Sequence, residues 1–173
     1  HLGTCKDLCL SFRSNVGAAS PCEVLTMCDA DFAGDSSRHS THGYTSTLDG
    51  SMINWQSELD KSKVALSTME SELKSMVEAC KDNMHHVHLL RDMKVQCNVK
   101  YKVANDNVPA IKLCCNPEHH GRAKHIDVAQ HFVRHLHSEG KIDLVHVGSE
   151  DNLADMLTKP LGLLVFERLR DRV

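Results

Sequence analysis

The sequence lacks several features that would assign it to a particular class of protein. No apolar run approaches the length of a membrane span, and the first residues are not followed by the apolar segment of a secretory signal. There is no internal repeat and no low-complexity tract. The chain also lacks an initiating Met and opens at HLGT, residues 1–4. We therefore interpret it as a piece cut from a longer intracellular protein, and we expect this piece to have no membrane partner.

Positive charge is also scarce, since 20 Lys and Arg stand against 23 Asp and Glu, for a formal net charge of -3 at pH 7. A dedicated nucleic-acid-binding protein is usually basic, so the overall charge does not favour that function. The net charge does not reveal a local strip of basic residues, however. The eight cysteines include no Cys-x-x-Cys pair. In a chain of this length without a secretory signal, they are predicted to be mostly reduced core thiols.

What the sequence does contain is enough apolar residues, 41% of 173, for one globular domain with a real core. Short apolar and β-branched runs bounded by turn residues predict strands. The Asp49-Gly50 pair between two of them is a strong hairpin signal. The predicted strands are Leu8–Phe12, Glu23–Cys28, Gly43–Leu48, Ser51–Trp55, Val99–Ala104 and Ile142–Val147.

From Met69 to Met93 the apolar residues recur at steps of three and four, which predicts an amphipathic helix of about seven turns. Four shorter helices are predicted at Pro109–Cys115, at Ala123–Ser138, at Asp151–Lys159 before the helix-ending Pro160, and at Leu164–Arg172. Hairpin strands followed by strands that alternate with helices indicate an α/β fold, with a mixed five-stranded sheet flanked by helices.

Carboxylates fall at the ends of these elements. Asp29 follows the first core strand in CDADFAGD, and Asp106 follows a later strand. Glu72 lies in the first turns of the long helix, and Asp155 lies in the helix after the last strand. A turn is the simpler explanation for one such cluster, because Asp and Gly are turn residues. However, strand ends and helix starts gather at one edge of an α/β sheet. Four acids meeting there would repel one another unless a cation joined them.

Oxygen ligands of this kind suit Mg²⁺ or Mn²⁺, and two such ions can act on a phosphodiester. Ser67 and Glu70 fit a capping box, so Glu70 has a structural role and is only the fallback ligand. Glu72 borders the buried stripe, where a carboxylate is costly unless it is used. By the same logic Asp151 is interpreted as a helix N-cap and Asp155 as the ligand.

Six motifs, in order, give the chain a resemblance to the ribonuclease H domain of copia-type (pseudovirus) LTR retrotransposon Pol polyproteins. The family pattern is approximately SDADWAGD, KSTSGY joined by a Gly-rich hairpin to ISW, VALSSTEAEY, CDNQSA, a TKHID helix and EDQLADILTKPL. This chain has CDADFAGD, RHSTHGYTSTLDGSMINW, KVALSTMESEL, NDNVPA, an AKHID helix and EDNLADMLTKPL. It departs from the pattern at Cys28, Phe32 and Pro109, and SELKSM places Lys74 near the site.

The resemblance implies a ribonuclease H-like fold over residues 23–173. Residues 1–22 would be the linker from the connection region of the reverse transcriptase. It also implies hydrolysis of the RNA strand of an RNA–DNA hybrid with two Mg²⁺ ions, which Mn²⁺ can replace, leaving a 3′-hydroxyl and a 5′-phosphate. The family's four acids map to Asp29, Glu72, Asp106 and Asp155. Asp29 and Asp106 would contact both ions, Glu72 the second ion, and Asp155 would lie near the leaving group.

The family setting implies a parent polyprotein with a reverse transcriptase domain, in the cytoplasm and in virus-like particles. Arg122, Lys124, Arg134 and Lys159 are candidate contacts to the phosphates of the hybrid, although each can equally be a solvated charge. A catalytically inactive relic with weak hybrid binding is the second hypothesis.

A zinc-stabilised interaction module is the third hypothesis. Thirteen His residues suggest it, but no paired Cys and His knuckles at tight spacing accompany them. The candidate zinc ligands are His85, His86, His88, Cys114, Cys115, His119, His120, His131 and His135.

Overall fold

A computed structural model describes residues 9–12, 22–34, 36, 38–61, 65, 67–95, 99–116 and 124–173, without the side chains of 124–127. Five strands form one sheet of order β3-β2-β1-β4-β5. The neighbours β1–β2 and β2–β3 are antiparallel, whereas β1–β4 and β4–β5 are parallel, so the predicted mixed five-stranded sheet is confirmed. The strands are β1 (Glu23–Asp31), β2 (Thr41–Leu48), β3 (Ser51–Leu59), β4 (Lys100–Asn105) and β5 (Asp143–His146).

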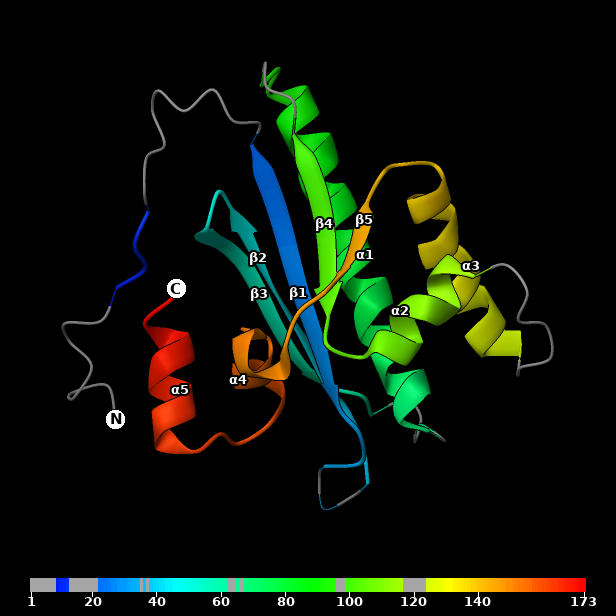
Figure 1. The fold of residues 1–173 in the computed structure, drawn as a ribbon, viewed down its shortest axis with the longest axis vertical. Coiled ribbons are helices and arrows are strands. Elements are labelled where there is room, and N and C mark those ends of the chain that lie inside the picture. The colour runs from blue at the N-terminus through cyan, green and yellow to red at the C-terminus, as the bar shows by residue number, and fades with distance from the viewer. Residues whose placement is uncertain are drawn as a thin grey trace.

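Helices cover both faces of this sheet (Figure 1). Three lie on one side, and two short ones lie on the other, beside a single turn of 3₁₀ helix, η1 (Ser149–Asp151). The first group is α1 (Thr68–Asp92), α2 (Val108–Cys115) and α3 (Lys124–Ser138), and the second is α4 (Asp155–Thr158) and α5 (Leu163–Arg170).

The two faces have separate apolar cores because side chains alternate along each strand. On β1, Cys28 packs into the core under α1, α2 and α3, whereas its neighbour Met27 packs into the core under α4 and α5. On β4, Val103 and Ala104 divide in the same way. The central strands are thus covered on both faces, and their ends are the places where polar groups can gather.

Local sequence signals fix the ends of several elements. Asp49 and Gly50 have φ of 50° and 81°, as a tight hairpin turn between β2 and β3 requires. The Ser67 hydroxyl accepts a hydrogen bond from the Glu70 amide at 3.2 Å, so the predicted cap begins α1. The Asn107 side chain accepts from the Ala110 amide at 3.0 Å and begins α2 immediately after β4.

Two sequence predictions are wrong. Within the predicted strand Leu8–Phe12, the described residues 9–12 are not in a strand, and Phe12 is 70% exposed, because no neighbouring strand pairs with them. Asp151 is not an N-cap: it ends η1, and its carboxylate pairs with Arg172 at 2.7 Å. Helix α4 begins four residues later than Asp151, because Asn152 has an extended backbone (φ -76°, ψ 106°).

The cysteines are partly as predicted. Those that the structure describes are free thiols, and Cys28, Cys80 and Cys114 are buried in the core, whereas Cys9 and Cys115 are exposed. Burial raises the pKa of the Cys114 thiol to about 12, so this thiol is protonated and unreactive at neutral pH. None of the helices in the described part of the chain is both long enough and apolar enough to cross a membrane.

Candidate metal centre

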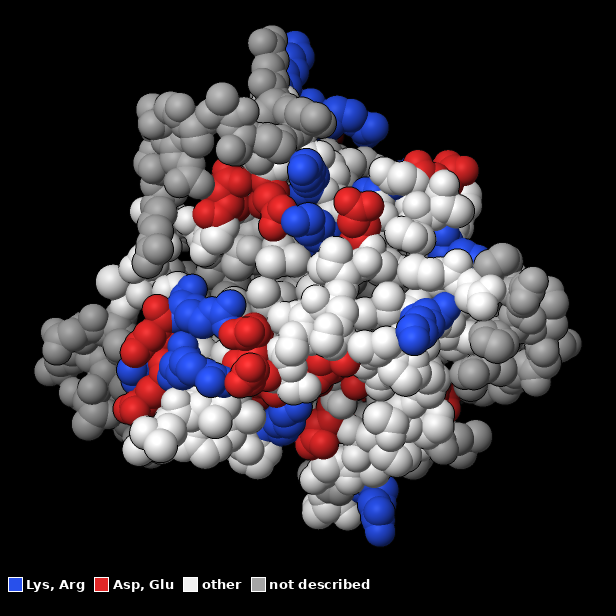
Figure 2. All heavy atoms as spheres, in the orientation of Figure 1, with Lys and Arg blue, Asp and Glu red and all other residues white. Residues whose placement is uncertain are grey.

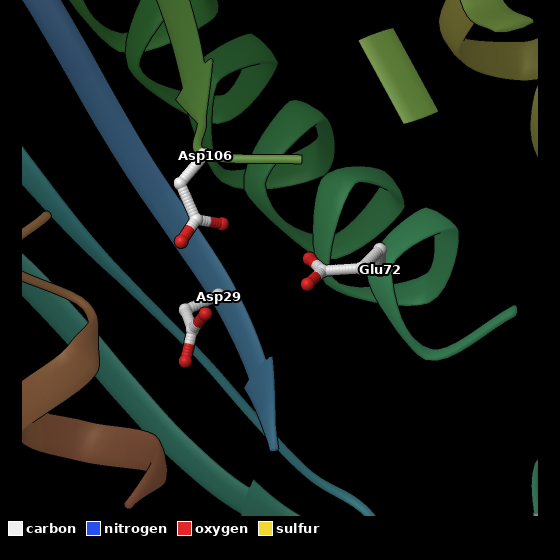
Figure 3. Close-up of side chains that lie close together, drawn as sticks. All are labelled: Asp29, Glu72 and Asp106. Carbon is white, nitrogen blue, oxygen red and sulfur yellow. The ribbon is translucent and has the colours of Figure 1, made fainter. Parts of the chain in front are cut away.

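Three carboxylates from distant parts of the sequence converge at one edge of the sheet. Asp29 comes from β1, Glu72 from the first turns of α1, and Asp106 directly follows β4, and Figure 3 shows their carboxylates facing a common space. One oxygen from each lies within 4.8 Å of the others. Asp29 and Glu72 are only 2% and 5% exposed. The edge that the sequence predicted therefore brings together three of its four predicted acids.

Two buried asparagines hold the strand end that carries Asp29. The side-chain amides of Asn105 and Asn152 both donate to the carbonyl oxygen of Cys28, at 3.1 and 3.0 Å. Asn105 ends β4, and Asn152 lies between η1 and α4. The backbone just before Asp29 is thus fastened to two neighbouring segments, which fixes the direction of its carboxylate.

Glu72 is held from the same side. Asn105 donates its second amide hydrogen bond to Glu72 Oε2 at 3.0 Å. Burial, with the nearby charges of Asp29 and Asp106, still raises the pKa of Glu72 to about 7, although the Asn105 bond opposes the shift. Glu70, the fallback ligand, contributes to the N-terminal cap of α1 and is not a member of the close group.

Asp106 sits in the turn between β4 and α2. The Asn107 amide donates to the side chain of Asn105 at 2.8 Å, which closes this turn. From the other side, the Ser149 hydroxyl donates to Asp106 Oδ2 at 2.7 Å. Asp106 is therefore oriented by η1 as well as by its own strand.

The fourth predicted acid, Asp155, lies beside this group but not within it. It begins α4 and is 4% exposed, and its Oδ1 is buried without a hydrogen-bond partner among the described residues. Burial raises the pKa of Asp155 to about 6, and Asp29 adds to the shift. Lys159 joins the two acids, with Nζ 2.9 Å from Asp155 Oδ2 and 3.6 Å from Asp29 Oδ2.

Helix α4 can reach Asp29 because β2 carries a glycine at the contact. Gly43 pairs with Asp29 across the sheet. A Cβ at Gly43 would lie 2.9 Å from the carbonyl oxygen of Gln56 on β3, which a side chain does not tolerate. It would also lie 3.1 Å from Leu157 Cβ and 3.2 Å from Thr158 Cγ2 on α4, so that α4 would have to shift by a few tenths of an ångström. The missing side chain lets α4 pack on the sheet, where the Thr158 hydroxyl donates to Asp29 Oδ2.

This donor set fits a hard divalent cation. Its ligand atoms are all carboxylate oxygens, the ligand type that Mg²⁺ and Mn²⁺ prefer. The buried Asp155 oxygen without a partner is the kind of group that a cation would satisfy. In the part of the chain that the structure describes, no other group of three His, Cys, Asp or Glu residues lies close enough to hold an ion. His119 and His120, two zinc candidates, lie outside that part.

Comparison with known proteins identifies relatives of this chain. The chain is 37% identical over 146 residues to the retrovirus-related Pol polyprotein from transposon RE2 of Arabidopsis thaliana, covering 84% of this chain and 10% of that protein. It is also 37% identical, over 84% of its length, to the corresponding polyprotein from transposon TNT 1-94 of Nicotiana tabacum, of which it covers 11%. No family model matches the chain. The chain thus spans about a tenth of the length of these relatives.

Solved structures identify the fold. LC11-RNase H1, in a crystal structure with an RNA/DNA hybrid, superposes with a TM-score of 0.57 at 14% identity, over 78% of this chain and 93% of that one. The chain is a ribonuclease H-like domain homologous to part of retrotransposon Pol polyproteins. The resemblance stated from the six motifs is thereby confirmed, and so is the predicted fold class.

The four basic residues proposed from the sequence have different surroundings in this ribonuclease H-like domain. Arg134 is engaged within the protein, because its guanidinium donates to the carbonyl oxygens of Leu113, Cys114 and Asn116 at the end of α2. Lys159 is paired with the acids. Arg122 and the side chain of Lys124 lie outside the described residues. The described residues in Figure 2 intersperse basic and acidic groups, without a continuous basic strip on this face.

Sequence reasoning missed the polar residues that position the acids. Asn105, Asn152 and Thr158 all lie within three residues of a predicted ligand. The signal for Thr158 was its spacing, because residues i and i+3 share a helix face and Thr158 follows Asp155 at that step. For the two asparagines the signal was weaker: a buried side-chain amide must find hydrogen-bond partners, but the sequence does not say which.

Proposed function

We propose that this ribonuclease H-like domain is a metal-dependent endonuclease that hydrolyses the RNA strand of an RNA–DNA hybrid and leaves a 3′-hydroxyl and a 5′-phosphate. The observation that carries the proposal is the convergence of Asp29, Glu72 and Asp106 within 4.8 Å, beside the buried Asp155. Burying carboxylates this close together is unfavourable. A function that requires their charge explains why they are there.

The four acids would hold two Mg²⁺ ions, for which Mn²⁺ can substitute. The ions would supply a more acidic water as nucleophile and neutralise charge that develops on the phosphodiester. The protein's own contribution is position: Asn105 orients Glu72, Ser149 orients Asp106, and Thr158 orients Asp29. Because these orienting groups lie on strands, helices and tight turns, the carboxylates are arranged before any substrate binds.

The relatives also support a setting for this activity. Since the chain matches about a tenth of each Pol polyprotein, we propose that it acts as the ribonuclease H part of a longer chain with a reverse transcriptase domain. Residues 1–22 would form the linker to that domain. The RNA–DNA hybrid would be its substrate, as in the LC11-RNase H1 complex.

Cleavage of a labelled RNA–DNA hybrid with Mg²⁺, and separately with Mn²⁺, tests the proposal. The wild-type chain is compared with Asp29→Asn and with a control, Asp143→Asn, which changes an exposed acid on β5. We expect cleavage by the wild type and the control, loss of at least about 10³-fold in Asp29→Asn, and no cleavage of RNA–RNA or DNA–DNA duplexes. Equal cleavage by wild type and Asp29→Asn would contradict the proposed site.

One observation favours the second hypothesis, an inactive domain with weak hybrid binding. The charges on the described surface are mixed and the net charge is -3, which gives little general attraction to a polyanion. A folded wild-type chain that retards the hybrid in a gel but cleaves it with neither ion would support this reading. Repeating the assay with the chain joined to its reverse transcriptase would distinguish an inactive site from weak substrate binding.

A further inference from the structure

The acid cluster, defined as Asp29, Glu72, Asp106 and Asp155, is not uniformly neutralised. Lys159 Nζ contacts Asp155 at 2.9 Å and Asp29 at 3.6 Å. In contrast, neither Glu72 nor Asp106 has an ion-pair partner within the part of the chain that the structure describes. One half of the cluster therefore already contains a positive charge, and the other half contains none.

Local sequence fixes the position of that positive charge. Lys159 follows α4 and precedes Pro160, and a residue before proline is restricted to extended backbone. Its φ of -141° and ψ of 152° match that restriction, and its amide donates to the Asp155 carbonyl at 3.3 Å. The Thr158 hydroxyl, one residue earlier, donates to the same Asp29 oxygen that Lys159 approaches. Adjacent side chains thus bind one carboxylate, and the ammonium reaches the second.

We propose that Lys159 neutralises Asp29 and Asp155 in place of a second divalent ion, so that the free protein binds one ion and takes up the second only by displacing the lysine. This inference rests on the proposed metal-dependent function. The Lys159 side chain is 34% exposed, so its ammonium can move toward solvent without disturbing the core. The buried Asp155 oxygen without a partner shows that one lysine does not satisfy both carboxylates.

The displacement has a functional consequence. A protein with two permanently bound ions would hold an activated water whether or not substrate were present. Because Lys159 takes the place of one ion, the second ion should bind only when a further ligand favours it over the lysine. An oxygen of a bound phosphodiester would be such a ligand. In the free protein, Lys159 is then a positioning residue that acts through Asp29 and Asp155.

Calorimetric titration of the metal-free protein with Mn²⁺, without any nucleic acid, tests the proposal. We expect one Mn²⁺ to bind tightly to the wild type. In Lys159→Met the dissociation constant of a second Mn²⁺ should be at least about tenfold lower than in the wild type, because the competing charge of the lysine has gone. Lys159→Arg keeps the charge and should behave as the wild type. Lys102→Met is the matched control: Lys102 is 31% exposed and pairs with Glu23 at 2.6 Å, at the other end of β1.

Thermal unfolding supplies a second readout that does not depend on calorimetric heats. In EDTA, Lys159→Met should unfold at a lower temperature than wild type, because Asp29 and Asp155 then repel each other unopposed. Saturating Mn²⁺ should remove that difference, whereas it should not remove any difference caused by a packing defect. Identical isotherms for wild type and Lys159→Met would overturn the role of Lys159 alone. Failure of every variant to bind Mn²⁺ would overturn the proposed function and this inference with it.

Discussion

Helix α1 places a buried carboxylate in two regions of the molecule, Glu72 near its start and Asp82 further along, and the two have opposite surroundings. Glu72 faces two other acids, and one amide donates to it. Asp82 accepts hydrogen bonds from Ser46 at 2.5 Å, Asn54 at 2.6 Å and Tyr44 at 3.3 Å. His86 Nδ1 lies 3.3 Å from it. These five residues are called the Asp82 network below.

The ionisation of the two acids differs accordingly. Burial alone would raise the pKa of Asp82, but His86, Ser46 and Asn54 lower it below the ordinary value of 3.8. The pKa of Glu72 rises from 4.5 to about 7. A buried acid that is charged and surrounded by donors stabilises the fold by itself. A buried acid among other acids does not, and it is this difference that separates a structural carboxylate from a functional one.

The largest effect is expected from Glu72→Gln, which keeps the shape of the side chain and removes its charge. Hybrid cleavage should fall about 10³-fold or more, since metal ligation contributes several kcal/mol to catalysis. The midpoint of thermal unfolding in EDTA should stay equal or rise, because one repelling charge has gone. Cleavage assays and thermal unfolding of the same preparation check both parts. A lower midpoint together with unchanged cleavage would make Glu72 a structural acid like Asp82.

The second largest effect is expected from Asp82→Ala, which should lower the stability of the fold, whereas Glu72→Gln lowers cleavage. Removing the acceptor leaves buried donors of Tyr44 and Asn54 without a partner, which should cost about 3 kcal/mol of unfolding free energy. For a chain of this size that lowers the unfolding midpoint by about 6–12 °C. Cleavage by the folded protein at low temperature should change little. The control is Glu78→Ala on the same helix, which breaks only the more exposed pair with Lys81 and should cost less than about 0.5 kcal/mol.

The two regions also differ in how well the sequence predicts them. Asp29, Glu72 and Asp106 are predictable because a carboxylate at a strand end, or beside an apolar stripe, contradicts its local pattern. The parallel pairing of β1 with β4 then brings two strand ends to one edge. The sequence gives no comparable indication for Asp82, because an acid within a long helix is ordinarily predicted to be exposed to solvent. Its partners on β2 and β3 are neighbours only through the folded sheet.

The same reasoning explains the errors near α4. Asp151 and Asp155 both look like helix-start acids, and only tertiary contacts separate them. Asn152 turns its amide to the Cys28 carbonyl and takes an extended backbone, so the helix starts after it. Long-range hydrogen bonds of this kind override local helix propensity, and the neighbouring sequence does not predict them.

The smallest effect is a pH dependence that distinguishes the two regions in metal-free protein. The folded-state pKa of Glu72 lies above its ordinary value, at about 7, so between about pH 4.5 and 7 the folded state binds more protons. Glu72 thus lowers stability progressively as pH rises through that window. His86 also has a raised pKa, because its contact with Asp82 favours the charged ring. Its stabilisation is complete below its ordinary pKa of 6.5 and is lost as pH rises through the folded-state value.

Both groups make the wild type less stable as pH rises, so the variants must separate them. The unfolding midpoint of Glu72→Gln should exceed that of wild type by a margin that grows from pH 5 to pH 7.5. The midpoint of His86→Gln should fall below wild type by a margin that shrinks over the same range. Thermal unfolding in EDTA at half-unit pH steps measures both. Margins that stay constant with pH would show that neither group changes its proton affinity on folding, and the contrast between the acid cluster and the Asp82 network would then rest on geometry alone.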